Sequence, residues 1–436
     1  MDGTPSHGID RHYVRNTAGI SAAEALWGLA LPVLVESTFL QLFLKHLGAS
    51  DVIVGLMPGL LSAGVGIFAL LAALLTSHLP SKRRAVIITH ISASVPILAF
   101  GLVLIAAGTT RGTVNIFIFF YALFALAIGV TLPVWQNFIV SIFTEGRMFR
   151  ALSVMLITQI TCRFLGGLIL VKFVERYSFS DASMGACFIT VALLLFAGSF
   201  FFLLVREERT GDAAPAHTVA SLALAVRGIL GNRDFVLFQL SNIDIFACVT
   251  VITFYASYAV ECRGVDRAVA AGLFIALIQA GAVASNVLFG WFNLLAIKSK
   301  YFFAKSAGLS AVAILLAAPC LPGFLAASFL IGMARGVHNI AYSPAVKLIS
   351  GRRDATDYFS VTPLLMLPFS FGIPFASGIY LNGMPGNAGC RYPILFAAMG
   401  VLVFASAAFL FFVDFGGKAV SAAEMAPAGE EIAPLE

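Results

Sequence analysis

Long apolar runs, separated by short polar connections, recur along the whole chain. Each run has about 20 residues or more, the length that an α-helix needs to cross a lipid bilayer. Backbone groups in hydrocarbon must bond internally, and the strands of a membrane barrel would be half as long and alternate in polarity, so we predict helices. The twelve predicted spans are 18–45, 52–79, 85–107, 114–142, 149–173, 182–205, 233–260, 268–296, 301–320, 323–349, 358–382 and 392–415.

Composition places these helices in a membrane and not in a large soluble core. Hydrophobic residues make up 60% of the 436 residues and charged residues only 11%, whereas soluble domains are about 25% charged. The polar first residues show no short apolar core followed by a cleavage site, so we expect no secretory signal. We find no phosphate loop, hydrolase motif or paired Cys/His spacing, and we therefore predict no enzyme activity, cofactor or metal.

Basic residues gather in alternate connections and predict the orientation of the helices. The clusters SKRR (Ser81–Arg84), KSK (Lys298–Lys300) and GRR (Gly351–Arg353) all fall on one face of the predicted topology. Lys and Arg are enriched in cytoplasmic loops, so we place this face and both termini in the cytoplasm. The formal net charge of +5 follows from this pattern and does not indicate a nucleic-acid partner. Because the loops are compact and one face is basic, we expect the chain to lie in a bacterial inner membrane.

Short matches indicate that the chain contains two similar halves. Gly129-Val130 and Ser153-Val154 recur 207 residues later as Gly336-Val337 and Ser360-Val361. Matches in this order predict a duplicated six-helix unit, as in many secondary transporters. We predict an N-terminal tail (1–17), two six-helix bundles (18–205 and 233–416), a cytoplasmic central loop (206–232) and a disordered cytoplasmic tail (417–436).

At this point the chain resembles the major facilitator superfamily. The resemblance covers about residues 17–416 and includes the entry to the second helix, Leu47–Leu56, which reads LGASDVIVGL. The following loop, ALLTSHLPSKRR, keeps the basic end of the family pattern at Lys82–Arg84 but lacks its aspartate. The Gly-Pro signature of proton-antiporting drug exporters is absent from the fifth helix, which reads TCRFLGGLIL. The resemblance implies an all-α transporter in which helices 1, 4, 7 and 10 line a central cavity.

Ionisable residues inside the predicted spans concentrate on these lining helices. Charged side chains are costly in a membrane and usually face a bundle interior or a watery cavity. Glu24 and Glu36 lie in helix 1, Asp244 in helix 7 and Arg335 in helix 10. Arg163 is the exception, in helix 5, which borders the cavity, and the outward-facing helices carry such residues only near their ends, as at Lys305. We predict Glu36 and Asp244 as proton-coupling residues, because burial favours the neutral form of a carboxyl group.

A polar stripe on helix 10 is the strongest candidate for a solute site. Arg335, His338, Asn339 and Tyr342 follow at i, i+3, i+4 and i+7, so they share one helix face. Arginine suits a carboxylate or phosphate, and a second arginine lies near the middle of the other half. The full set predicted to bind solute is Arg335, His338, Asn339, Tyr342, Arg163, Trp135, Gln136 and Asn242. The alternative for Arg335 is a structural pair with Asp244 or a glutamate.

We therefore predict a monomeric secondary transporter that moves a small organic solute by alternating access. Its expected partners are the solute, membrane lipids and a coupling proton. An anionic or zwitterionic solute is favoured, although a neutral site remains open if Glu36 and Asp244 cancel the two arginines. The alternatives are a lipid- or lysolipid-handling protein with a lateral opening beside helices 5 and 8, a drug exporter, or a solute sensor that does not transport.

Overall fold

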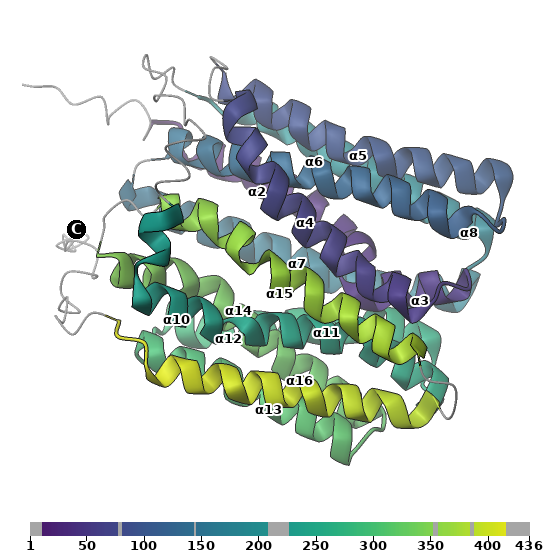
Figure 1. Ribbon diagram of the computed structural model, residues 1–436. Coiled ribbons are helices and arrows are strands. Elements are labelled where there is room, and N and C mark those ends of the chain that lie inside the picture. Colours follow the sequence, from purple (N-terminus) through teal and green to yellow (C-terminus); the bar gives the residue numbers. More distant parts are fainter. Residues whose placement is uncertain are drawn as a thin grey trace, which may run out of the picture.

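A computed structural model describes residues 11–76, 81–143, 145–207, 226–351, 356–383 and 388–415. Twelve helical segments within these residues are long and apolar enough to cross a membrane, which confirms the predicted number of spans. The segments pack side by side as one elongated bundle (Figure 1). The predicted C-terminal tail and most of the predicted central loop lie outside the described residues.

The first half supplies six of the spans. Its elements are α2 (Tyr13–Leu34), α3 (Ser37–His46), α4 (Asp51–Thr76), α5 (Lys82–Ala107), α6 (Thr113–Ile142), α7 (Glu145–Tyr177), α8 (Asp181–Phe200) and the 3-10 turn η1 (Phe201–Leu204).

The second half supplies the other six, with three short π-helical stretches. Its elements are α10 (Arg233–Ser241), α11 (Ile243–Ser257), η2 (Tyr258–Cys262), η3 (Val269–Leu273), α12 (Phe274–Ser285), η4 (Asn286–Trp291), α13 (Ile297–Ala317), α14 (Leu321–Ser350), α15 (Thr356–Gly383) and α16 (Ala388–Phe411).

Two of the predicted spans are not continuous helices. The first span breaks between α2 and α3, where Glu36 adopts an extended conformation with φ −78° and ψ 120°. Pro32 lies four residues earlier, and a proline inside a helix removes one backbone hydrogen bond and bends the chain. The seventh span breaks at Asn242, which separates α10 from α11. Each break leaves backbone groups and a polar side chain in the middle of the bundle.

The bundle has a terminal end and an opposite end. The chain crosses the bundle an even number of times, so the start of α2 and the end of α16 lie at the same end, on the left in Figure 1. We call this the terminal end. Polar contacts join the two halves from the break at Glu36 towards the opposite end. The Gln41 amide donates to the Ile252 carbonyl at 3.3 Å, and Lys45 Nζ lies 3.8 Å from Glu261.

Small residues let neighbouring helices approach to backbone contact. A Cβ atom added to Gly332 of α14 would lie 2.0 Å from the carbonyl oxygen of Ile278 in α12. Gly272 of η3 faces the carbonyl of Gly167 in α7 just as closely, with 2.3 Å between that oxygen and an added Cβ. Such close approaches are typical of helix pairs in membranes.

Gly332→Ala is therefore expected to destabilise the protein by about 1–3 kcal/mol, because overpacking forces the two helices apart. Thermal unfolding of the purified protein in detergent measures the effect. Gly372→Ala is the matched control, since no atom lies within 4 Å of a Cβ added there. This control should be neutral or stabilise by up to about 1 kcal/mol, through helix propensity alone. Equal stability of the two variants would contradict the close packing of α12 and α14.

Candidate functional site

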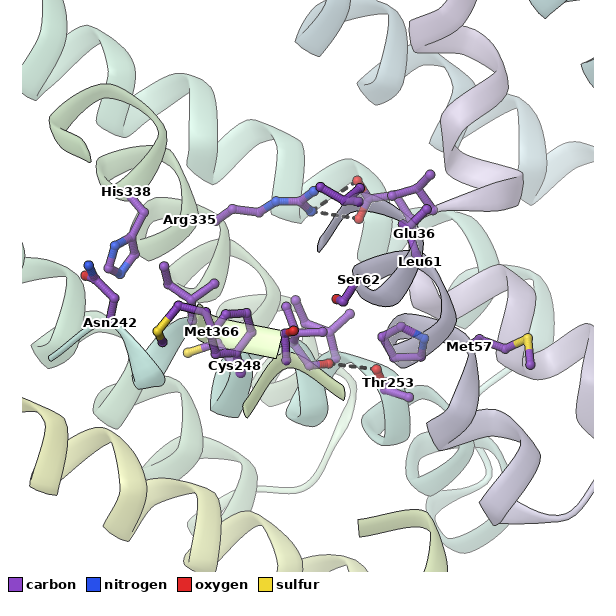
Figure 2. A pocket seen from close by; sticks show the side chains of 18 of the residues that line it. Glu36, Met57, Leu61, Ser62, Asn242, Cys248, Thr253, Arg335, His338 and Met366 are labelled. Carbon is purple, nitrogen blue, oxygen red and sulfur yellow. Dashed lines mark hydrogen bonds and ion pairs between the residues drawn. The ribbon is translucent and has the colours of Figure 1, made fainter. Parts of the chain in front are cut away.

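A cavity of about 630 Å³ lies between the two halves, within the range of small-molecule sites. Its walls come from α3, α4 and α6 of the first half and from α10, α11, α14 and α15 of the second (Figure 2). Most lining side chains are apolar. The polar and charged ones are Glu36, Gln41, Ser62, Tyr121, Gln239, Asn242, Thr253, Arg335, His338, Asn339, Tyr342, Ser343, Thr362 and Ser370.

Glu36 joins the two halves at the wall of this cavity. Arg335 Nη1 lies 2.9 and 3.1 Å from the two carboxylate oxygens of Glu36, as the dashed lines in Figure 2 show. Gln279 of α12 donates to the same carboxylate at 3.0 Å, and Arg163 Nη1 of α7 lies 3.7 Å away. Arg335 thus pairs with Glu36, the glutamate alternative that the sequence left open.

The burial of this cluster differs from one member to the next. The side chain of Glu36 is 3% exposed, that of Arg163 16%, and that of Arg335 34%. The guanidinium of Arg335 therefore has one face on Glu36 and another on the cavity. Two arginines against one glutamate leave the cluster one positive charge in excess when all three are ionised. The excess is centred on Arg163, which lies behind Glu36 and also interacts electrostatically with Glu24, whereas Arg335 is the arginine that faces the cavity.

A second buried cluster surrounds Asp244 in the first turn of α11. Lys305 of α13 lies 3.0 Å from one of its carboxylate oxygens, and His338 Nε2 lies 3.1 Å from the other. Lys305 also donates to the Ser241 carbonyl at the end of α10, and to Ser406 of α16 at 3.3 Å. This lysine therefore ties the break in the seventh span to two neighbouring helices. All members belong to the second half, so the cluster does not bridge the halves.

The polar stripe predicted on the tenth span lines the cavity. All four of its members, Arg335, His338, Asn339 and Tyr342, are among the lining residues. Tyr342 accepts a hydrogen bond from Gln239 of α10 at 3.1 Å and donates one to Thr362 of α15 at 2.9 Å. The stripe therefore forms a wall that is continuous with α10 and α15.

Three of the other predicted binding residues lie outside the cavity lining. Trp135 packs against the apolar cluster around Phe138 and Phe202, and Gln136 is exposed. The binding role predicted for these two gains no support from the cavity. Arg163 reaches the site only through Glu36. Asn242, by contrast, lines the cavity as predicted.

Two residues that complete the clusters, Lys305 and Gln279, were not among the site residues predicted from the sequence. Lys305 was expected near the end of an outward-facing span, but α13 begins at Ile297, two turns earlier, and the lysine is only 1% exposed. A predicted span that began a few residues earlier than 301 would have placed Lys305 within the membrane. Gln279 carries no charge, so the pattern of ionisable residues along the chain does not reveal it.

Comparisons with known proteins agree with this architecture. A family model described as Major Facilitator Superfamily matches residues 22–362. The nucleoside transporter NupG, as a single-residue variant, aligns with a TM-score of 0.71 and 13% identity over 90% of this chain and 99% of that one. A bacterial homologue of the human lysosomal transporter Spinster, in an inward-facing and unoccupied conformation, aligns with a TM-score of 0.64 and 14% identity. The alignment covers 94% of this chain and 98% of that one.

A D-xylose–proton symporter aligns with a TM-score of 0.65 and 12% identity over 92% of this chain and 97% of that one. No curated protein sequence matches the chain. At these identities the structural likeness shows the fold alone, whereas the family model covers more than three quarters of the sequence. The chain is a membrane transporter, not an enzyme, and belongs to the major facilitator superfamily.

Proposed function

We propose that the protein transports a small anionic or zwitterionic organic solute, coupled to a proton carried by Glu36. The observation that carries this proposal is the contact of Arg335 with Glu36 across the two halves, at the wall of the cavity. A carboxylate or phosphate of the solute would balance the excess positive charge of the cluster. Arginine presents a planar fork that binds such groups with two hydrogen bonds.

Glu36 and the solute compete for the same guanidinium. While Glu36 is ionised, its carboxylate occupies Arg335. A protonated Glu36 no longer offers a negative charge, so Arg335 is free to bind the acidic group of the solute. The proton on Glu36 and the solute on Arg335 are then bound at the same time. When either one leaves, the ion pair between Glu36 and Arg335 is favoured again. In the proposed cycle, the making and breaking of this inter-half pair accompanies the rocking of the halves.

Asp244, the other predicted proton carrier, is a weaker candidate in this geometry. It pairs with Lys305 and His338 inside a single half and does not line the cavity. A change in its charge would leave the contact between the halves untouched. We propose that Asp244 positions His338 and anchors the break of the seventh span.

The packing also bears on the lipid-handling alternative. A lateral opening beside the fifth and eighth spans would require a gap between α7 and η3–α12. At Gly167 and Gly272 the two backbones are in close contact. We therefore favour a solute that enters from the aqueous phase. We also propose that the protein works as a monomer in a bacterial inner membrane, with both termini in the cytoplasm.

Arg335→Lys tests the substrate class, since it keeps the charge but loses the fork. We expect the wild type to be stabilised against heat by at least one acid of a panel of glutarate, glutamine, orotate and 5-oxohexanoate, but not by glucose. In Arg335→Lys the same acid should bind about tenfold more weakly or worse, with the fold retained. Arg263→Lys, at the opposite end beside Tyr258, is the matched control. Stabilisation by glucose that Arg335→Lys leaves intact would overturn the proposal, and binding without transport into vesicles would indicate a sensor.

A further inference from the structure

Asn242 places an unpartnered amide at the wall of the cavity. Its side chain is 2% exposed, and within the described part of the chain neither its nitrogen nor its oxygen has a hydrogen-bond partner. Figure 2 shows it beside His338, on the side of the cavity away from Glu36. An asparagine at a helix start usually caps the helix with its side chain, but here the side chain makes no capping bond to α11.

The neighbouring Gln239 has the same character. It lies three residues earlier in the chain and lines the same cavity, and its side-chain oxygen also lacks a partner among the described residues. Its nitrogen is engaged by Tyr342. Buried polar groups are nearly always hydrogen-bonded, and leaving them unpaired is unfavourable. Two adjacent amides with one unpartnered nitrogen and two unpartnered oxygens therefore form a site suited to a polar ligand group.

The distance to Arg335 limits the size of the ligand. Tyr342, which contacts Gln239, follows Arg335 by seven residues on α14. Helix rise places it about 10 Å further along the axis. His338, which lies beside Asn242, is one turn from Arg335. A solute that reaches both points needs an acidic group and a polar group separated by about 5–10 Å.

We propose that Asn242, together with Gln239, binds a planar donor–acceptor edge of the solute, as found in a carboxamide, a lactam or a nucleobase. An asparagine amide pairs with such an edge through two parallel hydrogen bonds, because each side offers one donor and one acceptor. This inference rests on the proposed function, in which the acidic group of the same solute contacts Arg335. The transported solute is then an organic acid that carries an amide-like group.

Two matched pairs of compounds test this inference by thermal shift and by calorimetry. Glutaramate carries a carboxamide where 5-oxohexanoate carries a methyl ketone, and orotate carries imide and lactam edges that benzoate lacks. We expect the wild type to bind glutaramate, orotate or both about ten- to hundredfold more tightly than the matched analogue, because a site built to hydrogen-bond rejects a ligand that leaves it unpaired. A preference within the first pair alone indicates a primary amide, and within the second alone a ring edge.

Asn242→Leu should abolish the preference while affinity for 5-oxohexanoate or benzoate is kept. It should also raise the melting temperature of the ligand-free protein, since it removes an unpartnered buried amide. If Asn242→Leu does not fold, Asn242→Ala replaces it in the same measurement. Asn286→Leu is the matched control, because the Asn286 oxygen is also unpartnered but does not line the cavity. Equal wild-type affinities within both pairs, no binding of any of the four acids, or a preference that survives in Asn242→Leu would overturn the inference. Arg335→Lys should weaken the binding of both compounds of a pair by the same factor. An error in the proposed anion site can therefore be told apart from an error in the proposed amide site.

Discussion

Lys305→Met is expected to destabilise the protein by about 3–5 kcal/mol, the usual effect of removing one partner from a buried ion pair. The lysine is 1% exposed and lies 3.0 Å from Asp244. Its loss leaves a buried carboxylate with only His338 and removes the hydrogen bond to the Ser241 carbonyl. Thermal or denaturant unfolding in detergent measures the change.

The double variant Lys305→Met/Asp244→Asn supplies the control for this result. It removes both charges, so it should recover much of the stability that the single variant loses. Lys172→Met changes a lysine with an 81% exposed side chain and should have almost no effect. Additive losses in the double variant would show that Lys305 and Asp244 do not interact.

Glu36→Gln is expected to abolish accumulation of the solute against its gradient while solute exchange continues. Glutamine cannot carry a proton, so the solute no longer moves with one. The amide keeps the approximate shape of the side chain and leaves Arg335 available to the solute. Accumulation driven by an imposed pH gradient, and exchange in the absence of one, are measured in proteoliposomes with an acid that binds the wild type.

Glu24→Gln is the matched control, a change at another buried carboxylate of the first half. Glu24 accepts a hydrogen bond from Gln159 and does not line the cavity. This variant should still accumulate the solute. Normal accumulation by Glu36→Gln, or equal loss in both variants, would assign the coupling to another group.

The number of spans and the polar stripe were predictable because each depends on a local rule. A run of about 20 apolar residues is long enough to cross a bilayer whatever its neighbours are. The face shared by Arg335 and Tyr342 follows from the helical repeat alone. Placement of the ionisable residues in a cavity follows from the high cost of a charge in lipid.

The partners of these charges could not be predicted, since they depend on how the helices pack. Arg335 could have paired with Asp244 or a glutamate, and only the three-dimensional arrangement brings Glu36 to it. Lys305 was misplaced for a related reason. Its depth depends on where α13 begins, and helix ends are poorly defined by hydropathy.

The internal repeat extends further than the sequence matches indicated. Before the breaks of the first and seventh spans, α2 ends at Leu34 and α10 ends at Ser241, and these two residues are 207 positions apart. This is also the spacing of the paired motifs in the fourth and tenth spans. Both halves therefore break their first helix at an equivalent level, and each places a buried acid, Glu36 or Asp244, next to the break. Hydropathy does not reveal such a break, because the mean hydropathy over the whole span stays high.

In the proposed cycle solute and proton share the Arg335–Glu36 pair, and the number of protons taken up when the solute binds is the sharpest test of this sharing. The tightest-binding acid of the panel is titrated into the purified protein at pH 7.5, by calorimetry in two buffers of different ionisation enthalpy. The wild type should take up close to one proton per solute bound, since binding displaces Glu36 from Arg335 and leaves it protonated. Glu36→Gln should bind the acid with no proton uptake. Binding to the wild type without proton uptake, or unchanged proton uptake in Glu36→Gln, would show that Glu36 and the solute do not compete for Arg335.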